Sequence, residues 1–257
     1  MSGFKSKLGW VPNLFTLSNL TLGFLATLTA AVAMNNSASE KLLMTAGAFI
    51  FLAMLCDGAD GFAARLLDAR SNLGAQLDSL ADLATFGIAP GVMMYAFILH
   101  DYNYPLTGGV SIPTGMLLTA IYPACAAFRL ARFNVVHDDD SFVGLPSPVS
   151  GIIVGLMPVA FGDVIQIPEV ILIAIYLLCA FLMVSTIKYA KPQVTVLRRF
   201  SPVRLAIVAI FIAASLVFVG WRYGFAYSAA GLFTIIIVYV VIGIVALIIH
   251  AIQEYRM

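Results

Sequence analysis

Residues 41–64 read KLLMTAGAFIFLAMLCDGADGFAA, a mostly apolar stretch that nevertheless contains two acids, Asp57 and Asp60. A helix needs about 20 predominantly apolar residues to cross the hydrocarbon core of a bilayer. A charged side chain near the bilayer centre costs about 2.5–3.5 kcal/mol on insertion scales, so such residues usually mark a functional site. This stretch therefore predicts a helical membrane fold and indicates where its chemistry lies.

The whole chain shares this apolar character. Of its 257 residues, 61% are hydrophobic and 11% are charged, whereas about 25% of residues are charged in ordinary soluble domains. These values exclude both a soluble globular fold and a disordered chain. The net charge of +1 provides no general basic field, so we expect no nucleic-acid partner. Three scattered cysteines in apolar stretches do not form a disulfide framework.

Eight stretches are long and apolar enough to be candidate membrane spans. Proline residues lie near the starts of several of them, and Ser71 or Asn72 can cap the third. We therefore expect an all-α, polytopic membrane helical bundle that forms a single integral membrane domain over residues 1–257. The predicted spans are 13–34, 41–64, 75–99, 111–132, 148–163, 168–187, 202–221 and 226–251.

Lysine and arginine residues predict the orientation of the bundle, because cytoplasmic loops are enriched in them. With both termini in the cytoplasm, only Lys41 and Arg222 fall on the outer side. We therefore expect a protein of the inner cell membrane with cytoplasmic N- and C-termini. The cations placed on the cytoplasmic side are Lys5, Lys7, Arg65, Arg70, Arg129, Arg132, Lys188, Lys191, Arg198, Arg199, Arg204 and Arg256.

Four aspartates lie in the second and third predicted spans. Asp57 and Asp60 are three residues apart, and Asp78 and Asp82 are four apart, so each pair shares a helix face. A short hairpin around residues 66–73 predicts that the two helices are antiparallel neighbours, which allows all four carboxylates to meet. Asp57 precedes the cytoplasmic Arg65 by eight residues, about 12 Å of helix, so we expect the site near the cytoplasmic face.

Neutralising four buried carboxylates requires more positive charge than Arg65 supplies, so internal salt bridges alone would leave net negative charge. Oxygen ligands without histidine or cysteine favour Mg²⁺ or Mn²⁺ over zinc. Four acids suit two cations, and paired metals assist in-line phosphoryl displacement.

A cation-coupled transporter is the alternative class, because intramembrane acids also mark ion paths. A transporter would favour internal repeats, and the sequence contains no convincing second copy of the motif.

Gly61 and Gly74 lie on or beside the carboxylate faces of these helices. Without a side chain at these positions, a phosphate or nucleotide can approach the backbone closely. Small residues are also common where membrane helices pack against each other. The two interpretations are compatible, and the sequence does not separate them.

Together these residues form the pattern Asp57-x-x-Asp60-Gly61-x-x-Ala64-Arg65, then eight residues, then Gly74-x-x-x-Asp78-x-x-x-Asp82. The pattern resembles the signature of the CDP-alcohol phosphatidyltransferase family. The resemblance implies membrane enzymes, often homodimers, that use a CDP-linked substrate and release CMP. It implies that Asp57, Asp60, Asp78 and Asp82 bind two divalent cations, Mg²⁺ or Mn²⁺, with Asp82 also the general base. The implied CDP-binding residues are Gly61, Ala64, Arg65 and Gly74, together with Asn13 and Thr16, which match the typical start of the family.

Three further stretches resemble the phosphatidylserine synthase branch of this family: Phe86–Pro90, Arg129–Asn134 and Gly144–Pro148. The resemblance implies CDP-diacylglycerol and L-serine as substrates, a catalytic core over residues 1–192 and two additional spans over residues 193–257. The metal motif alone leaves glycerol 3-phosphate, inositol phosphate or choline open as acceptors, because it serves the shared CDP half.

Arg129, Arg132 and Asn134 are the candidate acceptor-binding residues. The two arginines are three residues apart at a predicted cytoplasmic helix end. A guanidinium group suits a phosphate or the carboxylate of an amino-acid acceptor, and Asn134 can hydrogen-bond the acceptor. Anchoring to lipid headgroups is the alternative role of the arginines.

Overall fold

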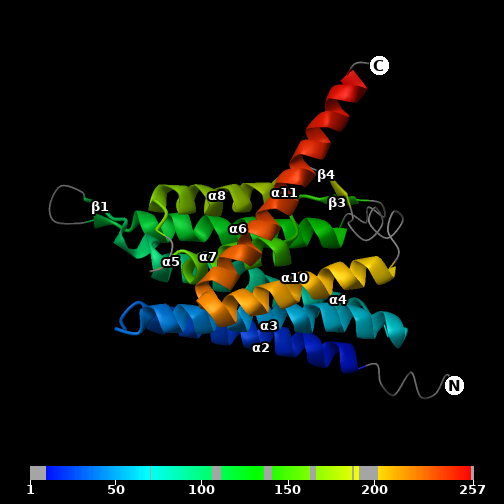
Figure 1. The fold of residues 1–257 in the computed structure, drawn as a ribbon, viewed down its shortest axis with the longest axis horizontal. Coiled ribbons are helices and arrows are strands. Elements are labelled where there is room, and N and C mark those ends of the chain that lie inside the picture. The colour runs from blue at the N-terminus through cyan, green and yellow to red at the C-terminus, as the bar shows by residue number, and fades with distance from the viewer. Residues whose placement is uncertain are drawn as a thin grey trace.

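The computed structural model describes residues 10–69, 71–105, 111–135, 141–162, 166–186, 188–190 and 202–255. Long helices lie roughly side by side and make up most of the molecule (Figure 1). Their bounds are α2 (Val11–Ala33), α3 (Ser39–Leu66), α4 (Asn72–Asp82), α5 (Ala89–Phe97), α6 (Thr114–Val135), α7 (Ser147–Ala160), α8 (Glu169–Val184), α10 (Pro202–Tyr223) and α11 (Phe225–Tyr255). The shorter elements are the π-helix η1 (Leu83–Ile88), the 3₁₀ turn η2 (Leu99–Asp101), and the strands β1 (Tyr104–Pro105), β2 (Ser111–Ile112), β3 (Ser141–Val143) and β4 (Lys188–Ala190).

A helix lies at each of the eight predicted positions, with the third formed by α4, η1 and α5 in succession. Within the described ranges, four helices are long and apolar enough to cross a membrane: Val11–Ala33, Ser39–Leu66, Asn72–Phe97 and Thr114–Val135. Shorter apolar helices follow at Ser147–Ala160, Glu169–Val184 and Phe225–Val238. The prediction of a helical membrane protein is therefore confirmed. Two short antiparallel strand pairs, β1 with β2 and β3 with β4, were not predicted.

The turn between α3 and α4 explains how the two aspartate-bearing helices are joined. Asp68 adopts a left-handed conformation (φ 52°), and the amide of Ala69 donates to the carbonyl of Ala64 at 3.0 Å, which ends α3 in the manner of a Schellman motif. Ser71 then caps α4, because its hydroxyl accepts a hydrogen bond from the amide of Gly74 at 3.0 Å. Of the two predicted caps, Ser71 is the one used.

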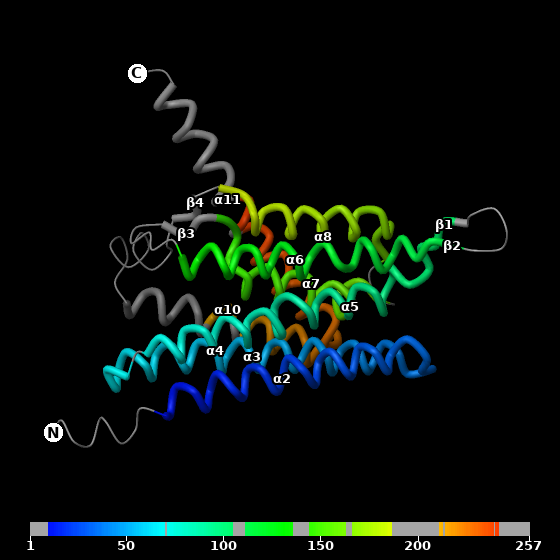
Figure 2. The backbone as a smooth tube through the Cα atoms, turned by 180° about the vertical axis from the view of Figure 1, so that it is seen from behind, coloured from blue at the N-terminus to red at the C-terminus, as the bar shows by residue number. Residues whose placement is uncertain are grey.

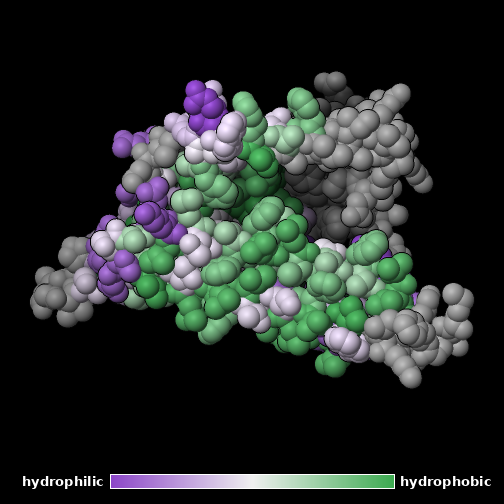
Figure 3. All heavy atoms as spheres, turned by 60° about the horizontal axis from the view of Figure 1, so that its bottom comes forward, coloured by the Kyte–Doolittle hydropathy of each residue, from purple (hydrophilic) through white to green (hydrophobic). Residues whose placement is uncertain are grey.

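The surface of α2 and α3 is apolar over a wide area, which Figure 3 shows as a broad green band. Such a surface suits contact with lipid rather than water. Its exposed large hydrophobic residues include Leu14, Leu17, Phe24, Leu25, Leu28 and Val32 of α2 and Phe51, Leu52, Leu55 and Phe62 of α3.

The principal core lies between α5, α6, α7, α8 and the first half of α11. Tyr122 and Tyr176 stack there with ring centroids 5.0 Å apart, and Phe161 meets Phe233 of α11 edge to face at 4.9 Å. Outside this core, the C-terminal end of α6 reaches α4, where Asn134 hydrogen-bonds Ser79. Of the cations used to predict orientation, Lys5, Lys7, Arg70, Lys191, Arg198, Arg199 and Arg256 lie outside the described residues.

Candidate active site

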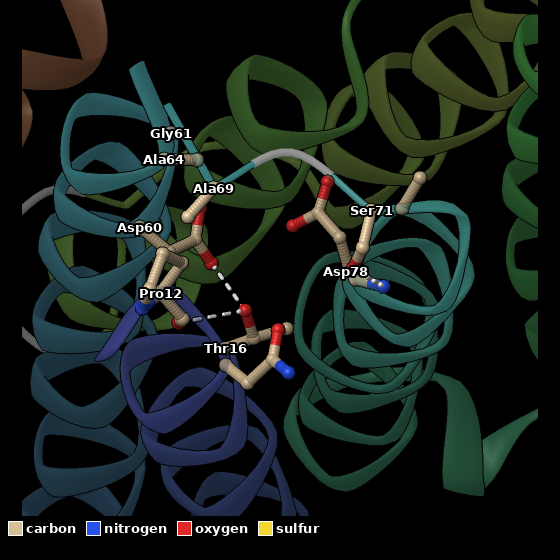
Figure 4. Close-up of a pocket in the computed structure, with 11 residues that line it drawn as sticks. Pro12, Thr16, Asp60, Gly61, Ala64, Ala69, Ser71 and Asp78 are labelled. Atoms are coloured by element: carbon tan, nitrogen blue, oxygen red, sulfur yellow. Dashed lines mark hydrogen bonds between the residues drawn. The ribbon is translucent and has the colours of Figure 1, made fainter. Parts of the chain in front are cut away.

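A cavity of about 210 Å³ opens between α2, α3 and α4. In Figure 4, Asp60 and Thr16 lie on one side of it, and Asp78 and Ser71 lie on the other. Most of the predicted CDP-binding residues line this cavity, so the structure brings together positions far apart in the sequence. The lining residues are Pro12, Asn13, Thr16, Asp60, Gly61, Ala64, Ala69, Ser71, Gly74, Ala75 and Asp78.

Three of the four predicted metal ligands form a tight cluster beside this cavity. One carboxylate oxygen from each of Asp57, Asp60 and Asp78 lies within 4.8 Å of the others. Asp60 accepts a hydrogen bond from the Thr16 hydroxyl at 2.9 Å. The expected direct packing of α3 on α4 is replaced by a different arrangement: α2 packs against both, and the carboxylates meet across the cavity. This arrangement leaves room for a ligand between the two aspartate pairs.

Asp82 is buried to about the same degree as Asp60 of the cluster, with 8% of its surface exposed against 7%. Its carboxyl group is within hydrogen-bonding reach of Asp57, and its Oδ1 lies 3.4 Å from the side-chain nitrogen of Asn19. Asp82 therefore joins the other three aspartates through Asp57, and all four predicted ligands share one region.

These aspartates form no direct ion pairs with the arginine and lysine side chains that the structure describes, although the charge of Arg129 interacts with Asp82. Arg65 is exposed, and its Nε donates to the carbonyl of Gly61 at 3.0 Å rather than to an acid. Oδ1 of Asp78 is buried and has no hydrogen-bond partner among these residues. An all-oxygen donor set of this kind, without described ion-pair partners, fits hard divalent cations such as Mg²⁺ or Mn²⁺.

The two glycines of the motif have different surroundings. A Cβ built on Gly61 would meet no atom of the described structure within 4 Å, so this glycine opens the cavity rather than packing a helix. A Cβ on Gly74 would lie 3.1 Å from the Ser71 hydroxyl and 3.3 Å from Oδ1 of Asn13. Gly74 therefore allows Asn13 of α2 to approach the start of α4. Gly74 also lines the cavity, so both interpretations open from the sequence remain compatible with it.

The predicted acceptor residues at the end of α6 bind three different parts of the protein. Arg129, 7% exposed, donates to the hydroxyl of Ser147 at 2.6 Å, and its Nε is buried without a partner in the described part. Arg132 donates to the carbonyls of Met183, Val184 and Ser185 at 2.8–3.2 Å, which caps α8. Asn134 exchanges hydrogen bonds with Ser79 of α4, at 3.0 and 3.2 Å.

Sequence reasoning overlooked several polar residues around these groups, namely Asn19, Ser79, Thr85 and Ser147. A sequence signal exists for Asn19. It follows Thr16 by three residues and precedes Gly23 by four, so all three lie on one face of a helix, and all three are buried. A polar residue on such a face within an apolar span is a candidate site residue for the same reason as the aspartates.

The geometry agrees with what the family comparison finds. The family profile described as CDP-alcohol phosphatidyltransferase matches residues 9–197, well over half of the chain. The chain belongs to this family. The cavity and the four aspartates lie within the matched residues, so they occupy the part of the chain that family members have in common.

Several curated relatives of the family are CDP-diacylglycerol–serine O-phosphatidyltransferases. The protein from Bacillus subtilis (strain 168) is 33% identical over 184 residues, which cover 71% of this chain and 90% of the relative. The protein from Helicobacter pylori (strain ATCC 700392 / 26695) is 32% identical over 184 residues, with coverages of 69% and 70%. The protein from Mycobacterium leprae (strain TN) is 34% identical over 183 residues, with coverages of 65% and 56%. The aligned part of this chain spans about half the length of the mycobacterial relatives.

Proposed function

We propose that this protein transfers the phosphatidyl group of CDP-diacylglycerol to the hydroxyl of L-serine, which produces phosphatidylserine and CMP. The observation that carries the proposal is the set of four aspartates, none of which forms an ion pair with a described side chain, beside a cavity walled by Gly61. The serine transferases among the relatives support the choice of substrates.

The proposed metal ligands are Asp57, Asp60, Asp78 and Asp82, which would hold two divalent cations, Mg²⁺ or Mn²⁺. Bound cations would neutralise the pyrophosphate of the substrate and stabilise CMP as the leaving group. The unpartnered oxygen of Asp78 supports this role, because a buried oxygen without a partner is costly unless a ligand satisfies it.

The cavity is the proposed binding site for the CDP group. Gly61 and Ala64 form one wall, Gly74 forms the opposite one, and Asn13 and Thr16 contribute polar atoms from α2. Arg65 lies outside the lining residues and donates to the Gly61 carbonyl. We propose that Arg65 supports this wall and is near enough to meet a phosphate at its exposed edge.

Asp82 is the proposed general base. It accepts the proton of the serine hydroxyl, whose oxygen attacks the phosphorus that carries diacylglycerol. The bond between that phosphorus and the oxygen of CMP breaks in the same displacement, so no covalent enzyme intermediate is needed. The burial of Asp82 and its nearness to Asp57 support this role.

Arg129 is the proposed contact for the carboxylate of serine. Its buried Nε lacks a partner in the described part of the chain, and its positive charge interacts with Asp82. An unpaired N–H of a guanidinium group is a strong donor to a carboxylate. Arg132 and Asn134, predicted to share this role, would support the pocket through the end of α8 and through Ser79.

We further propose that the chain is a homodimer of the inner membrane, with eight spans, both termini in the cytoplasm and the site near the cytoplasmic face. The core would comprise residues 1–192, and the last two spans would lie within residues 193–257. The positive residues assigned to the cytoplasmic side support this topology. Labelling of single cysteines introduced at each terminus tests it, and labelling from the outer side would contradict it.

CMP release tests the activity directly. The purified full-length protein, supplied with CDP-diacylglycerol and Mn²⁺ or Mg²⁺, should release CMP only when serine is added. Chelation with EDTA should stop the release, and fresh metal should restore it. A parallel screen with glycerol 3-phosphate, inositol phosphate and choline separates the acceptors. Release with one of these alcohols and none with serine would overturn the acceptor assignment while retaining the CDP chemistry.

A further inference from the structure

Asn19 of α2 is a buried polar residue that contacts Asp82. Its side chain has no exposed surface, and its Nδ2 donates to Oδ1 of Asp82 at 3.4 Å. Its own Oδ1 has no hydrogen-bond partner in the described chain. A buried amide that satisfies only part of its hydrogen bonds does not favour stability. This cost indicates that Asn19 is present for its effect on Asp82.

Thr85 holds the backbone of Asn19 in place. The Thr85 hydroxyl donates to the carbonyl of Asn19 at 3.0 Å, and Thr85 is fully buried. A Cβ atom on Gly23 would collide with the Thr85 hydroxyl and backbone. The glycine one turn after Asn19 therefore lets α2 approach η1 closely enough for this hydrogen bond to form.

Thr85 lies close in sequence to Asp82, the residue that Asn19 contacts. Thr85 lies in η1, the π-helical segment that begins directly after Asp82, and short π-helical segments are frequent at functional sites. Figure 2 shows α2 running along α4 and α5, and α2 contacts η1 as well. Asp82 and Thr85 thus meet Asn19 from the same helix, one at its side chain and the other at its backbone.

We propose that Asn19 is a positioning residue for Asp82 and that Thr85 acts through Asn19. The inference rests on the proposed function, in which Asp82 accepts the proton of the acceptor alcohol. The amide of Asn19 holds one oxygen of the Asp82 carboxylate, so that the other oxygen is presented to the acceptor hydroxyl. The hydroxyl of Thr85 holds the backbone of Asn19, and so keeps its amide aligned with this carboxylate.

Steady-state kinetics of the full-length protein test the role of Asn19. Asn19→Leu keeps most of the side-chain volume and removes the amide. We expect kcat to fall about 10- to 100-fold, with the KM values for CDP-diacylglycerol and the acceptor changed less than about twofold. An unchanged kcat would overturn the proposal. A raised KM for the acceptor at constant kcat would also overturn it, because Asn19 would then bind the acceptor directly.

Variants of Thr85 test the second half of the proposal and remain informative if Asn19→Leu fails to fold. Thr85→Val preserves shape but removes the hydroxyl, and should lower kcat about three- to tenfold. Thr85→Ser retains the donor and should restore most of the rate. Equal rates in the valine and serine variants would refute the role of the hydroxyl.

The double variant Asn19→Leu/Thr85→Val completes the test. If Thr85 acts through Asn19, the double variant should be no slower than Asn19→Leu alone, whereas multiplied losses would show independent roles. All variants are assayed with whichever alcohol supports CMP release by the wild type. Failure of serine would then overturn only the acceptor assignment. If the wild type failed to release CMP with every alcohol tested, the proposed function would be overturned, and the positioning role with it.

Discussion

The two sides of the candidate site differ in how their polar groups are satisfied. On the acidic side, formed by α3 and α4, the carboxylates form no ion pair with a described side chain, and an oxygen of Asp78 has no described hydrogen-bond partner. On the basic side, at the end of α6, Arg132 binds three carbonyl groups and Asn134 binds Ser79. Arg129 is intermediate, because it binds Ser147 and retains an unpaired Nε.

This difference distinguishes residues with unsatisfied polar atoms, which we propose bind a ligand, from residues whose hydrogen bonds connect helices. Inside a protein, an unpaired polar atom is expensive, so it persists where a bound ligand satisfies it. A polar group that is already hydrogen-bonded within the protein contributes to the stability of the fold instead. The comparison therefore predicts large losses of activity from the acidic side and mainly losses of stability from the basic side.

The largest effect is expected from Asp78→Asn. Removing one carboxylate charge weakens cation binding, and a bound metal supplies several kcal/mol to such a reaction, so kcat should fall at least about 10³-fold. CMP release measures the loss, and Mn²⁺ binding followed by electron paramagnetic resonance should weaken in parallel. Asp68→Asn is the matched control, since Asp68 is exposed in the α3–α4 turn. Normal turnover by Asp78→Asn would rule out this residue as a metal ligand.

A smaller effect is expected when the cavity wall is filled. Both Gly58 and Gly61 lie in α3, and a Cβ on either would meet no described atom within 4 Å, but only Gly61 lines the cavity. Alanine at either position should stabilise the helix by about 0.5–1 kcal/mol. Gly61→Ala alone should raise the KM for CDP-diacylglycerol, about ten- to 100-fold if the added methyl overpacks the bound substrate.

The pair of glycine variants provides its own control. Equal KM values for CDP-diacylglycerol in Gly58→Ala and Gly61→Ala would contradict binding of the CDP group against Gly61. A loss of thermal stability in Gly61→Ala would show that this glycine packs against a neighbour in the membrane and not against substrate.

Spacing predicted the helices and the acidic side well, because both depend on local periodicity. Asp57, Asp60 and Gly61 lie within one turn or so of each other, so the helix itself sets their relation. The basic side was less predictable from the sequence. The partners of Arg132 lie more than 50 residues away at the end of α8, and no helical period reports a contact across that distance. The place of α2 between α3 and α4 is likewise a property of packing.

Lysine substitutions distinguish the two arginines of α6. Arg129→Lys keeps the charge but loses the planar fork, so the serine KM should rise about tenfold, equivalent to one charge-assisted hydrogen bond. Arg132→Lys should lower the free energy of unfolding by about 1–2 kcal/mol through the lost carbonyl contacts, with little change in the serine KM. The sequence alone predicts an effect on the acceptor from both, so a raised KM in Arg132→Lys would return that arginine to the acceptor pocket.

The smallest effect is expected from the link between Ser79 and Asn134. Hydrogen bonds between membrane helices contribute about 0.6 kcal/mol on average, so Ser79→Ala should lower the melting temperature only slightly and change kcat less than about threefold. Asn134→Leu alone leaves the Ser79 hydroxyl without this partner, whereas the double variant removes both polar groups and should regain part of the lost stability. If Asn134→Leu instead raised the serine KM at unchanged stability, Asn134 would contact the acceptor, and the division between an acidic side that binds ligands and a basic side that holds helices would fail at that residue.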